Sequence, residues 1–175
     1  MAAGQASLSR PGSLAILRSR RRWSRTLPRF VLARVLAIIW AALKALPVPL
    51  LRWPGGCYAD HYHWRDGVGP AEQRPVRLGM SCGLQVEDDN SLGTHEFLRL
   101  CGEIGAEPYL AGNVGSGTPQ ELADWLEYCN TGLPSALGRE RRANGASDPF
   151  GVRLWGVGNE NWGCGGNFDA AQYAN

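Results

Sequence analysis

The chain has 175 residues, of which 44% are hydrophobic and 19% charged, and its 18 Lys and Arg against 16 Asp and Glu give a formal charge of +2. This composition excludes a collagen, a coiled coil, a disulfide-rich mini-protein and a wholly disordered segment. The charge is divided along the chain: residues 1–59 carry ten basic side chains and no acidic one, and all sixteen acids follow from Asp60. We therefore expect two parts of different character.

The first part begins with an Arg-rich segment over residues 1–34, which we expect to be a disordered arm or a non-native start. The apolar stretch 30–51 overlaps its end, and Arg34, Lys44 and two prolines interrupt it, which argues against a membrane span. Nucleic-acid binding is not expected either, because only one aromatic residue lies among the arginines. Helical spacing instead predicts an amphipathic helix whose buried face holds Val35, Ile38, Ile39, Ala42, Leu43 and Leu46.

Five cysteines in an odd number, without a C-x-x-C pair, favour reduced thiols and a cytoplasmic protein. The alternative is secretion through an N-terminal signal, since the basic start precedes an Ala-rich apolar run. Cys57, Asp60, His61 and His63 are candidate metal ligands, but their spacing is not that of a zinc site, and we expect no metal. No cofactor is expected, because the glycines around residue 156 do not open a helix.

In the second part, helices alternate with strands. Apolar runs predict strands at 48–53, 107–113 and 151–159. Thr94 and Thr118 begin helices, the second through a capping box with Glu121, and this second helix is expected to bury Leu122, Trp125, Leu126 and Cys129. Residues 57–93 are expected to be irregular, and a polar loop with Arg139, Arg141 and Arg142 should precede the third strand. Such alternation predicts an α/β fold with a parallel sheet.

Polar residues follow the strands where each one ends. Arg52, Asn113, Asn159 and Glu160 occupy these positions, and the carboxyl ends of parallel strands line the crevice in which α/β proteins bind ligands. Asn113 is accordingly a candidate substrate-binding residue. Glu160, beside Trp155 and Trp162, is expected to be partly desolvated, which suits a general acid. The alternative is a loop carboxylate that holds backbone amides or an arginine.

Six motifs occur in a fixed order: LRWPGGC at 51–57, YHWRDGVGP at 62–70, GTHEF at 93–97, GAEP at 105–108, WLEYCN at 125–130 and GNE at 158–160. Together they resemble the α-L-arabinofuranosidases of glycoside hydrolase family 51, over about residues 38–174. The resemblance implies a retaining glycosidase that releases non-reducing-end α-L-arabinofuranosyl residues from arabinose-containing oligosaccharides and polysaccharides. It also implies a (β/α)8 TIM barrel, of which residues 35–175 would form about three βα units, including strand four.

The resemblance assigns a role to each of five residues. Glu160 is implied to be the general acid/base, and Asn159 to bind the sugar 2-hydroxyl. Arg52 is implied to keep the nucleophilic carboxylate ionised. Cys57 falls where the family contacts the sugar, and Trp162 would wall the glycone site.

Two departures from the family pattern stand out. Residues 79–85 (GMSCGLQ) replace a segment that commonly carries a tryptophan near the binding site. The family's nucleophile is a glutamate on barrel strand seven, beyond this chain, so we expect a fragment without hydrolytic activity, from an enzyme that forms homo-oligomers. The alternatives are a barrel glycosidase acting on a pyranoside and a non-catalytic carbohydrate-binding module.

Overall fold

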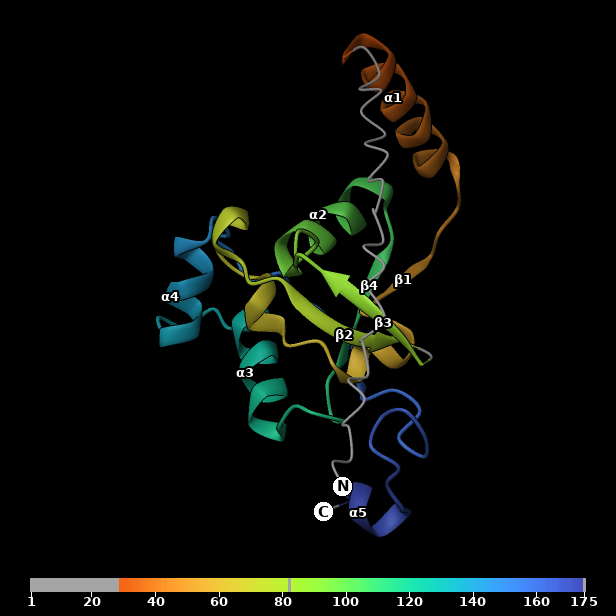
Figure 1. Cartoon of the computed structure of the whole chain (residues 1–175). Coiled ribbons are helices and arrows are strands. Elements are labelled where there is room, and N and C mark those ends of the chain that lie inside the picture. Colours follow the sequence, from red (N-terminus) through yellow and green to blue (C-terminus); the bar gives the residue numbers. More distant parts are fainter. Residues whose placement is uncertain (1–28, 82, 175) are drawn as a thin grey trace, which may run out of the picture. The chain divides into compact units, whose positions relative to one another are not determined.

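The computed structural model describes residues 29–81 and 83–174 (Figure 1). Most of the expected Arg-rich arm, residues 1–28, lies outside these ranges. The chain divides into two compact units, Met1–Ile38 and Ile39–Asn175. The division falls inside the first helix, α1 (Arg29–Ala45), and the unit from Ile39 onward contains all the other elements.

Helix α1 forms where the apolar periodicity predicts it, but the expected burial of its apolar face is wrong. Ile38 is 69% exposed, and Val35, Ile39, Ala42 and Leu46 are exposed as well, while Leu43 is half-buried. Spacing at 3.6 residues identifies a helix with an apolar side, but it does not supply the surface against which that side would pack.

A parallel sheet of three strands occupies the centre of the second unit. It consists of β1 (Leu50–Trp53), β4 (Glu107–Gly112) and β5 (Leu154–Val157), in the order β1-β4-β5. Tyr109 is the register partner of Arg52 on one side and of Leu154 on the other. The three predicted strands are therefore confirmed, and their carboxyl ends lie at one edge of the sheet.

Helices lie between successive strands of the sheet along the chain, as connections between parallel strands usually do. α2 (Thr94–Ile104) ends at Gly105, whose φ of 75° lies in the left-handed region. α3 (Pro119–Asn130) begins at Thr118, whose Oγ1 accepts a hydrogen bond from the Glu121 N–H at 3.1 Å. The predicted starts of both helices and the cap at Thr118 are confirmed, but the cap of α2 is Gly93, one residue before Thr94, and the Glu121 carboxylate contacts His63 where a capping box would turn it back to Thr118. The expected face of α3 is partly confirmed: Trp125 and Cys129 are buried, Leu122 is half-buried, and Leu126 is 45% exposed.

The expected polar loop after α3 is wrong, because it contains a further helix, α4 (Ala136–Ala143), which lies beside α3 (Figure 1). Arg141 on this helix is fully buried. Its Nη1 donates hydrogen bonds to the carbonyls of Tyr128 (3.0 Å) and Thr131 (2.7 Å) at the end of α3. The charge is therefore placed where helix carbonyls lack an intrahelical partner.

The region expected to be irregular holds regular structure too. After β1 come three 3₁₀ turns, η1 (Gly56–Asp60), η2 (Trp64–Gly67) and η3 (Ala71–Gln73), and then an antiparallel hairpin of β2 (Arg77–Ser81) and β3 (Leu84–Asp88). A short helix, α5 (Ala170–Ala174), follows the sheet.

Aromatic rings fill the space between the sheet and the helices. Trp53 from β1 packs against Phe97 of α2 and Trp125 of α3, with ring centroids 5.4 and 6.1 Å apart. Trp64 from η2 stacks on Trp125 at 6.3 Å. Aromatic burial of this extent contributes a large part of the hydrophobic stabilisation, and it anchors the segment after β1 against α3.

Candidate active site

The carboxyl ends of the outer strands β1 and β5 are joined directly. Nη2 of Arg52, on β1, donates a hydrogen bond of 2.7 Å to Oδ1 of Asn159, which follows β5. The Arg52 guanidinium also lies over the ring of Tyr109 on the intervening strand, 5.8 Å from its centroid. Two of the predicted site residues therefore meet across all three strands, next to Glu160.

The backbone turns sharply at Glu160, which has a positive φ of 46°. A non-glycine residue in this region is strained by about 1–3 kcal/mol, and such residues concentrate at functional sites. The Glu160 carbonyl accepts hydrogen bonds from the N–H groups of Gly163 (2.7 Å) and Gly165 (3.3 Å), which closes the loop after β5. The glycine-rich sequence of this loop allows so tight a turn.

The expected desolvation of Glu160 is not found. Its side chain is exposed, and Trp162 is 77% exposed. Trp155 points into the core instead, where its ring meets that of Trp125 at 5.6 Å and its Nε1 donates to the Val152 carbonyl. Because side chains alternate between the two faces of a strand, Trp155 packs against the helix α3 and not beside Glu160.

A disulfide joins Cys57 in η1 to Cys164 in the loop after β5, with a Cα–Cα distance of 5.4 Å. The expectation of reduced thiols is thus wrong for this pair, and an odd cysteine count without close pairs could not reveal a bond across 107 residues. Free thiols were a reason to expect a cytoplasmic protein, and that reason is removed. Cys101 and Cys129 are free and buried.

The disulfide lies against the predicted site. Sγ of Cys164 is 3.5 Å from Oε2 of Glu160 and 3.9 Å from Nδ2 of Asn159. A disulfide sulfur carries no hydrogen, so the side chain of Cys57 can contact a sugar only through packing or as a weak acceptor.

Asp60 is a fully buried carboxylate that the sequence singled out only as a candidate metal ligand. Its Oδ1 accepts a hydrogen bond from the Val114 N–H at 3.2 Å, and its Oδ2 accepts one from the Asn159 N–H at 3.0 Å. Burial raises the pKa of Asp60, although these backbone hydrogen bonds act to lower it. A single side chain thus connects η1 with the segments that follow β4 and β5.

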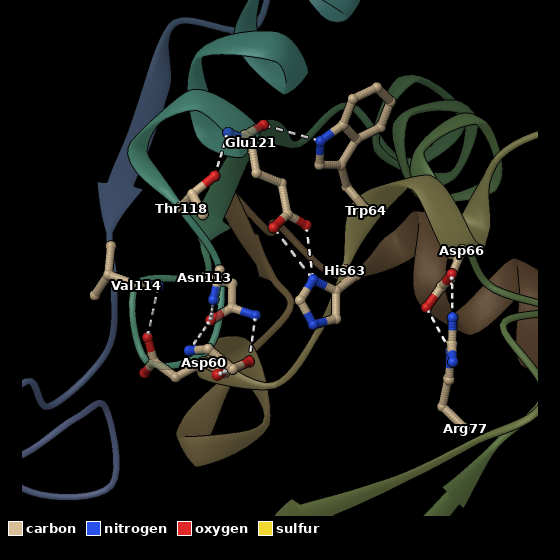
Figure 2. A network of polar contacts seen from close by, with 11 residues as sticks. Asp60, His63, Trp64, Asp66, Arg77, Asn113, Val114, Thr118 and Glu121 are labelled. Carbon is tan, nitrogen blue, oxygen red and sulfur yellow. Dashed lines mark hydrogen bonds and ion pairs between the residues drawn. The ribbon is translucent and has the colours of Figure 1, made fainter.

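Asn113 organises the loop that contains it (Figure 2). Its Oδ1 accepts hydrogen bonds from the N–H groups of Ser116 (2.9 Å) and Gly117 (3.0 Å), and its Nδ2 donates to Ser116 Oγ (2.9 Å). One amide hydrogen is left for another partner. Its predicted contact with substrate stays a prediction, while the structure gives this buried side chain a local role that shapes the end of β4.

The first turn of α3 binds the segment after β1. Nδ1 of His63 lies 2.9 Å from Oε1 of Glu121, and Nε1 of Trp64 donates to the Glu121 carbonyl at 2.9 Å (Figure 2). Sequence reasoning missed this pairing, since the partners are 58 and 57 residues apart. A cavity of about 570 Å³ opens beside it, lined by residues that include Tyr58, Arg77 and Ser116.

The His63 contact also bears on the metal question. Within the described ranges, the group that could offer an ion three ligand atoms is Cys57, Cys164 and Glu160, not the histidines. The two sulfurs form a disulfide and so provide no thiolate, which is the form that binds metals. No step at this site is therefore assigned to a metal.

The model of the α-L-arabinofuranosidase 1 domain matches residues 42–175. The chain belongs to the family 51 arabinofuranosidases. It is 53% identical over 136 residues to an intracellular exo-α-L-arabinofuranosidase of Bacteroides ovatus, a match that covers 78% of this chain and 26% of the relative.

Solved arabinofuranosidases have the same fold over this region. The enzyme of Xanthomonas axonopodis pv. citri matches with a TM-score of 0.72 and 52% identity, over 75% of this chain and 27% of that one. The Thermotoga maritima enzyme, in its arabinose complex, matches with a TM-score of 0.69 and 46% identity, over 73% and 26%. The chain thus spans about a quarter of the length of these relatives.

Membership in the arabinofuranosidase family agrees with the resemblance carried by the six motifs. The relatives reported above are themselves named as arabinofuranosidases. Among the described residues of this chain, no helix has both the length and the apolar character needed to cross a membrane.

Proposed function

We propose that this chain carries the acid/base half of a retaining α-L-arabinofuranosidase site, with Glu160 as the general acid/base. The observation that carries the proposal is the Arg52–Asn159 hydrogen bond of 2.7 Å, which joins the ends of β1 and β5 immediately beside Glu160. The relatives of this chain are arabinofuranosidases. The contact between Arg52 and Asn159 gives the exposed Glu160 carboxyl polar neighbours at the edge of the sheet where such folds bind ligands.

The architecture proposed for the complete domain is a (β/α)8 barrel, of which this chain forms about three βα units. Two features support it: the three parallel strands lie in sequence order, and helices occur between successive strands. On this proposal β5 is barrel strand four, and Glu160 lies at its carboxyl end.

The mechanism uses Glu160 twice. The protonated carboxyl first donates its proton to the glycosidic oxygen as the bond to the anomeric carbon breaks. A second carboxylate, about 5 Å away in retaining enzymes, attacks that carbon and forms a glycosyl-enzyme intermediate. Glu160, now ionised, then removes a proton from water as the water attacks the anomeric carbon and releases arabinose.

The neighbouring residues bind and orient the sugar in this proposal. Asn159 donates an amide hydrogen to the 2-hydroxyl while Arg52 holds its Oδ1. Arg52 retains N–H groups for the nucleophilic carboxylate, and Trp162, exposed on the loop, walls the glycone. The substrate is then a non-reducing-end arabinofuranosyl residue of an oligosaccharide or polysaccharide.

The nucleophile is proposed to lie outside this chain, so residues 1–175 alone should not turn over an aryl arabinofuranoside. Purified chain assayed with 4-nitrophenyl arabinofuranoside tests this, with the full-length enzyme as the control. By full-length enzyme we mean this chain joined to the remaining part that its relatives carry. Turnover by residues 1–175 would refute the proposed division of the site.

Glu160→Gln in the full-length enzyme tests the acid/base role. The amide cannot donate the catalytic proton, so hydrolysis of an arabino-oligosaccharide should fall by about 10²–10⁴-fold. Binding of arabinose, followed by calorimetry, should be retained, and Glu127→Gln on α3 serves as a control. Unchanged hydrolysis would overturn the role, and matched aryl pyranosides in the same assay test whether the enzyme requires a furanoside.

The proposal extends to assembly and location. We propose that the full-length enzyme is a homo-oligomer, which light scattering of the purified protein checks. A cytoplasmic location is retained as a proposal, and cell fractionation with an antibody against the chain separates it from secretion.

A further inference from the structure

We propose that Asp60 is a positioning residue for Glu160, holding the backbone that aims the catalytic carboxyl. This inference rests on the proposed function, because it assigns the acid/base role to Glu160. Asp60 itself does not face the substrate in this account. It acts through the backbone of Asn159, the residue immediately before Glu160.

The Asp60 carboxylate is shared between two segments. Oδ2 accepts the Asn159 N–H at 3.0 Å, and Oδ1 accepts the Val114 N–H at 3.2 Å. In addition, Oγ of Ser116 donates to the Asp60 carbonyl at 3.0 Å. Since Asp60 is the last residue of η1, these bonds tie the segment after β1 to the ends of both other strands. The position of the Asn159 backbone is thereby set relative to the whole edge of the sheet.

The surrounding backbone fits closely around this carboxylate. A Cβ at position 115 would lie 2.8 Å from Cβ of Asp60, and one at position 165 would lie 2.7 Å from its Oδ2 and collide with the Asn159 carbonyl. Only glycine allows both loops to approach Asp60 so closely. Two independent chain segments therefore accommodate the same side chain, as expected of a built support and not of a chance contact.

Glu160 depends on that support because of its backbone conformation. Its φ of 46° is unfavourable for a non-glycine residue, so the turn persists only if neighbouring bonds hold it. Asp60 fixes the N–H of Asn159 on the N-terminal side, and the N–H groups of Gly163 and Gly165 fix the Glu160 carbonyl on the C-terminal side. Without the first bond, the Asn159 backbone loses its tie to η1, although Arg52 still binds the Asn159 side chain.

Asp60→Asn weakens this support with little change in volume. The amide oxygen can accept one of the two N–H groups, but the NH₂ group faces the other N–H without an acceptor. The carboxyl of Glu160 should then be less well aimed at the leaving oxygen. Misplacement of a reacting group by about 1 Å can reduce a rate by about 10²-fold.

Leaving-group chemistry distinguishes positioning of an acid from general damage. An acidic phenol departs without a proton, whereas a sugar alkoxide needs one, so only poor leaving groups require Glu160 in its correct place during bond cleavage. We expect Asp60→Asn in the full-length enzyme to lower kcat/KM for an arabino-oligosaccharide about tenfold more than for 2,4-dinitrophenyl arabinofuranoside. The ratio of the two values is independent of the fraction of enzyme that is folded.

The control is Asp66→Asn, which removes a carboxylate of the same segment that pairs with Arg77 and touches neither Val114 nor Asn159. It should leave the ratio unchanged. If Asp60→Asn yields no folded enzyme, Asp60→Ser offers a smaller side chain with one acceptor oxygen, and the same ratio is measured. If Asp60→Asn lowered kcat/KM equally for both substrates, or for neither, the positioning role would be overturned.

The outcome also separates this inference from the proposed function. If the unsubstituted full-length enzyme does not cleave arabinofuranosides, or Glu160→Gln shows no dependence on the leaving group, the proposed function fails. If both behave as expected and Asp60→Asn lowers kcat/KM equally for all substrates, only the inference about Asp60 fails.

Discussion

Arg74 shows how one side chain can hold a long connection in place. It is 4% exposed, and its guanidinium donates to the carbonyls of Gly69 (2.8 Å) and Asn90 (2.9 Å) and to both carboxylate oxygens of Glu96 on α2 (3.0 and 3.1 Å). Glu96 in turn accepts the Gly93 N–H at 3.0 Å, at the start of the helix. The buried side chain of this arginine is thus satisfied by one carboxylate and several carbonyls.

Glu96→Gln should make the full-length enzyme less stable at neutral pH but not at low pH. Partial burial acts to raise the pKa of Glu96, but hydrogen bonds from Arg74 and the Gly93 N–H bring it below the ordinary 4.5. A lowered folded pKa gives stability that is present above 4.5 and lost as the pH falls through the folded pKa. Because Glu96 is 29% exposed, screening limits the effect to about 1 kcal/mol.

Thermal unfolding from pH 7 to pH 3 measures this difference. Glu103→Gln is the matched control, since Glu103 lies on the same helix and pairs with Lys44 where both side chains are about half exposed. Its removal should change stability by less than about 0.5 kcal/mol. If the difference in unfolding temperature between Glu96→Gln and the unsubstituted enzyme were the same at pH 3 as at pH 7, the stabilising role of the ionised Glu96 would be contradicted.

At the scale of elements, the first turn of α3 both caps the helix and binds the segment after β1. Thr118 Oγ1 accepts the Glu121 N–H at 3.1 Å, and the Glu121 side chain holds His63. Thr118→Ala leaves this N–H without its acceptor and should destabilise the helix by about 1 kcal/mol. Hydrogen exchange of peptides over the first turns of α3, in the full-length enzyme, should become faster.

Thr118→Ser is the control for this change, because it keeps the oxygen that accepts the hydrogen bond. Hydrogen exchange over the first turns of α3 in this variant should remain close to that of the unsubstituted enzyme. Equal acceleration by Ala and Ser would show that the methyl group, and not the cap, accounts for the effect.

The elements that the sequence predicts are those with local signals. The cap at Thr118, the glycine end of α2 at Gly105 and the apolar run of β4 each depend on residues within a few positions of one another. The hairpin of β2 and β3 also has a local signal, which the expectation of an irregular region overlooked: apolar and other residues alternate in RLGMS (77–81) and LQVED (84–88), with two residues between them. Its apolar residues Leu78 and Leu84 are nevertheless exposed. α4 was missed because Arg141 looks like a surface residue and is buried.

At the scale of the whole molecule, the motifs predict which residues gather at the sheet edge but not what holds them. Arg52, Asn159 and Glu160 follow from the rule that parallel strands end at one edge. Asp60 contacts Asn159 across 99 residues, and Cys57 pairs with Cys164 across 107. Contacts at such separations depend on the completed fold, and no spacing within the sequence encodes them.

The disulfide encloses most of the described unit, and its removal should therefore affect global stability. In the chain-entropy model a closed loop of about 100 residues stabilises the folded state by about 4–5 kcal/mol, mainly by restricting the unfolded chain. We expect the Cys57→Ser, Cys164→Ser double variant of the full-length enzyme to unfold at lower urea concentration, with a loss of about 3–5 kcal/mol. Reduction of the unsubstituted enzyme by dithiothreitol should produce a similar loss.

The double variant also supplies the control for the reductant. Among the described residues, the cysteines outside the disulfide are Cys101 and Cys129, and both are free and buried, so dithiothreitol should leave the unfolding midpoint of the double variant unchanged. Thiol titration of the denatured, unsubstituted enzyme should find two additional thiols after reduction. If the bond is reduced by this measure and the midpoint does not move, the link between η1 and the loop after β5 does not stabilise the fold. The Asp60 hydrogen bonds would then be the remaining described tie between η1 and the segment that carries Glu160.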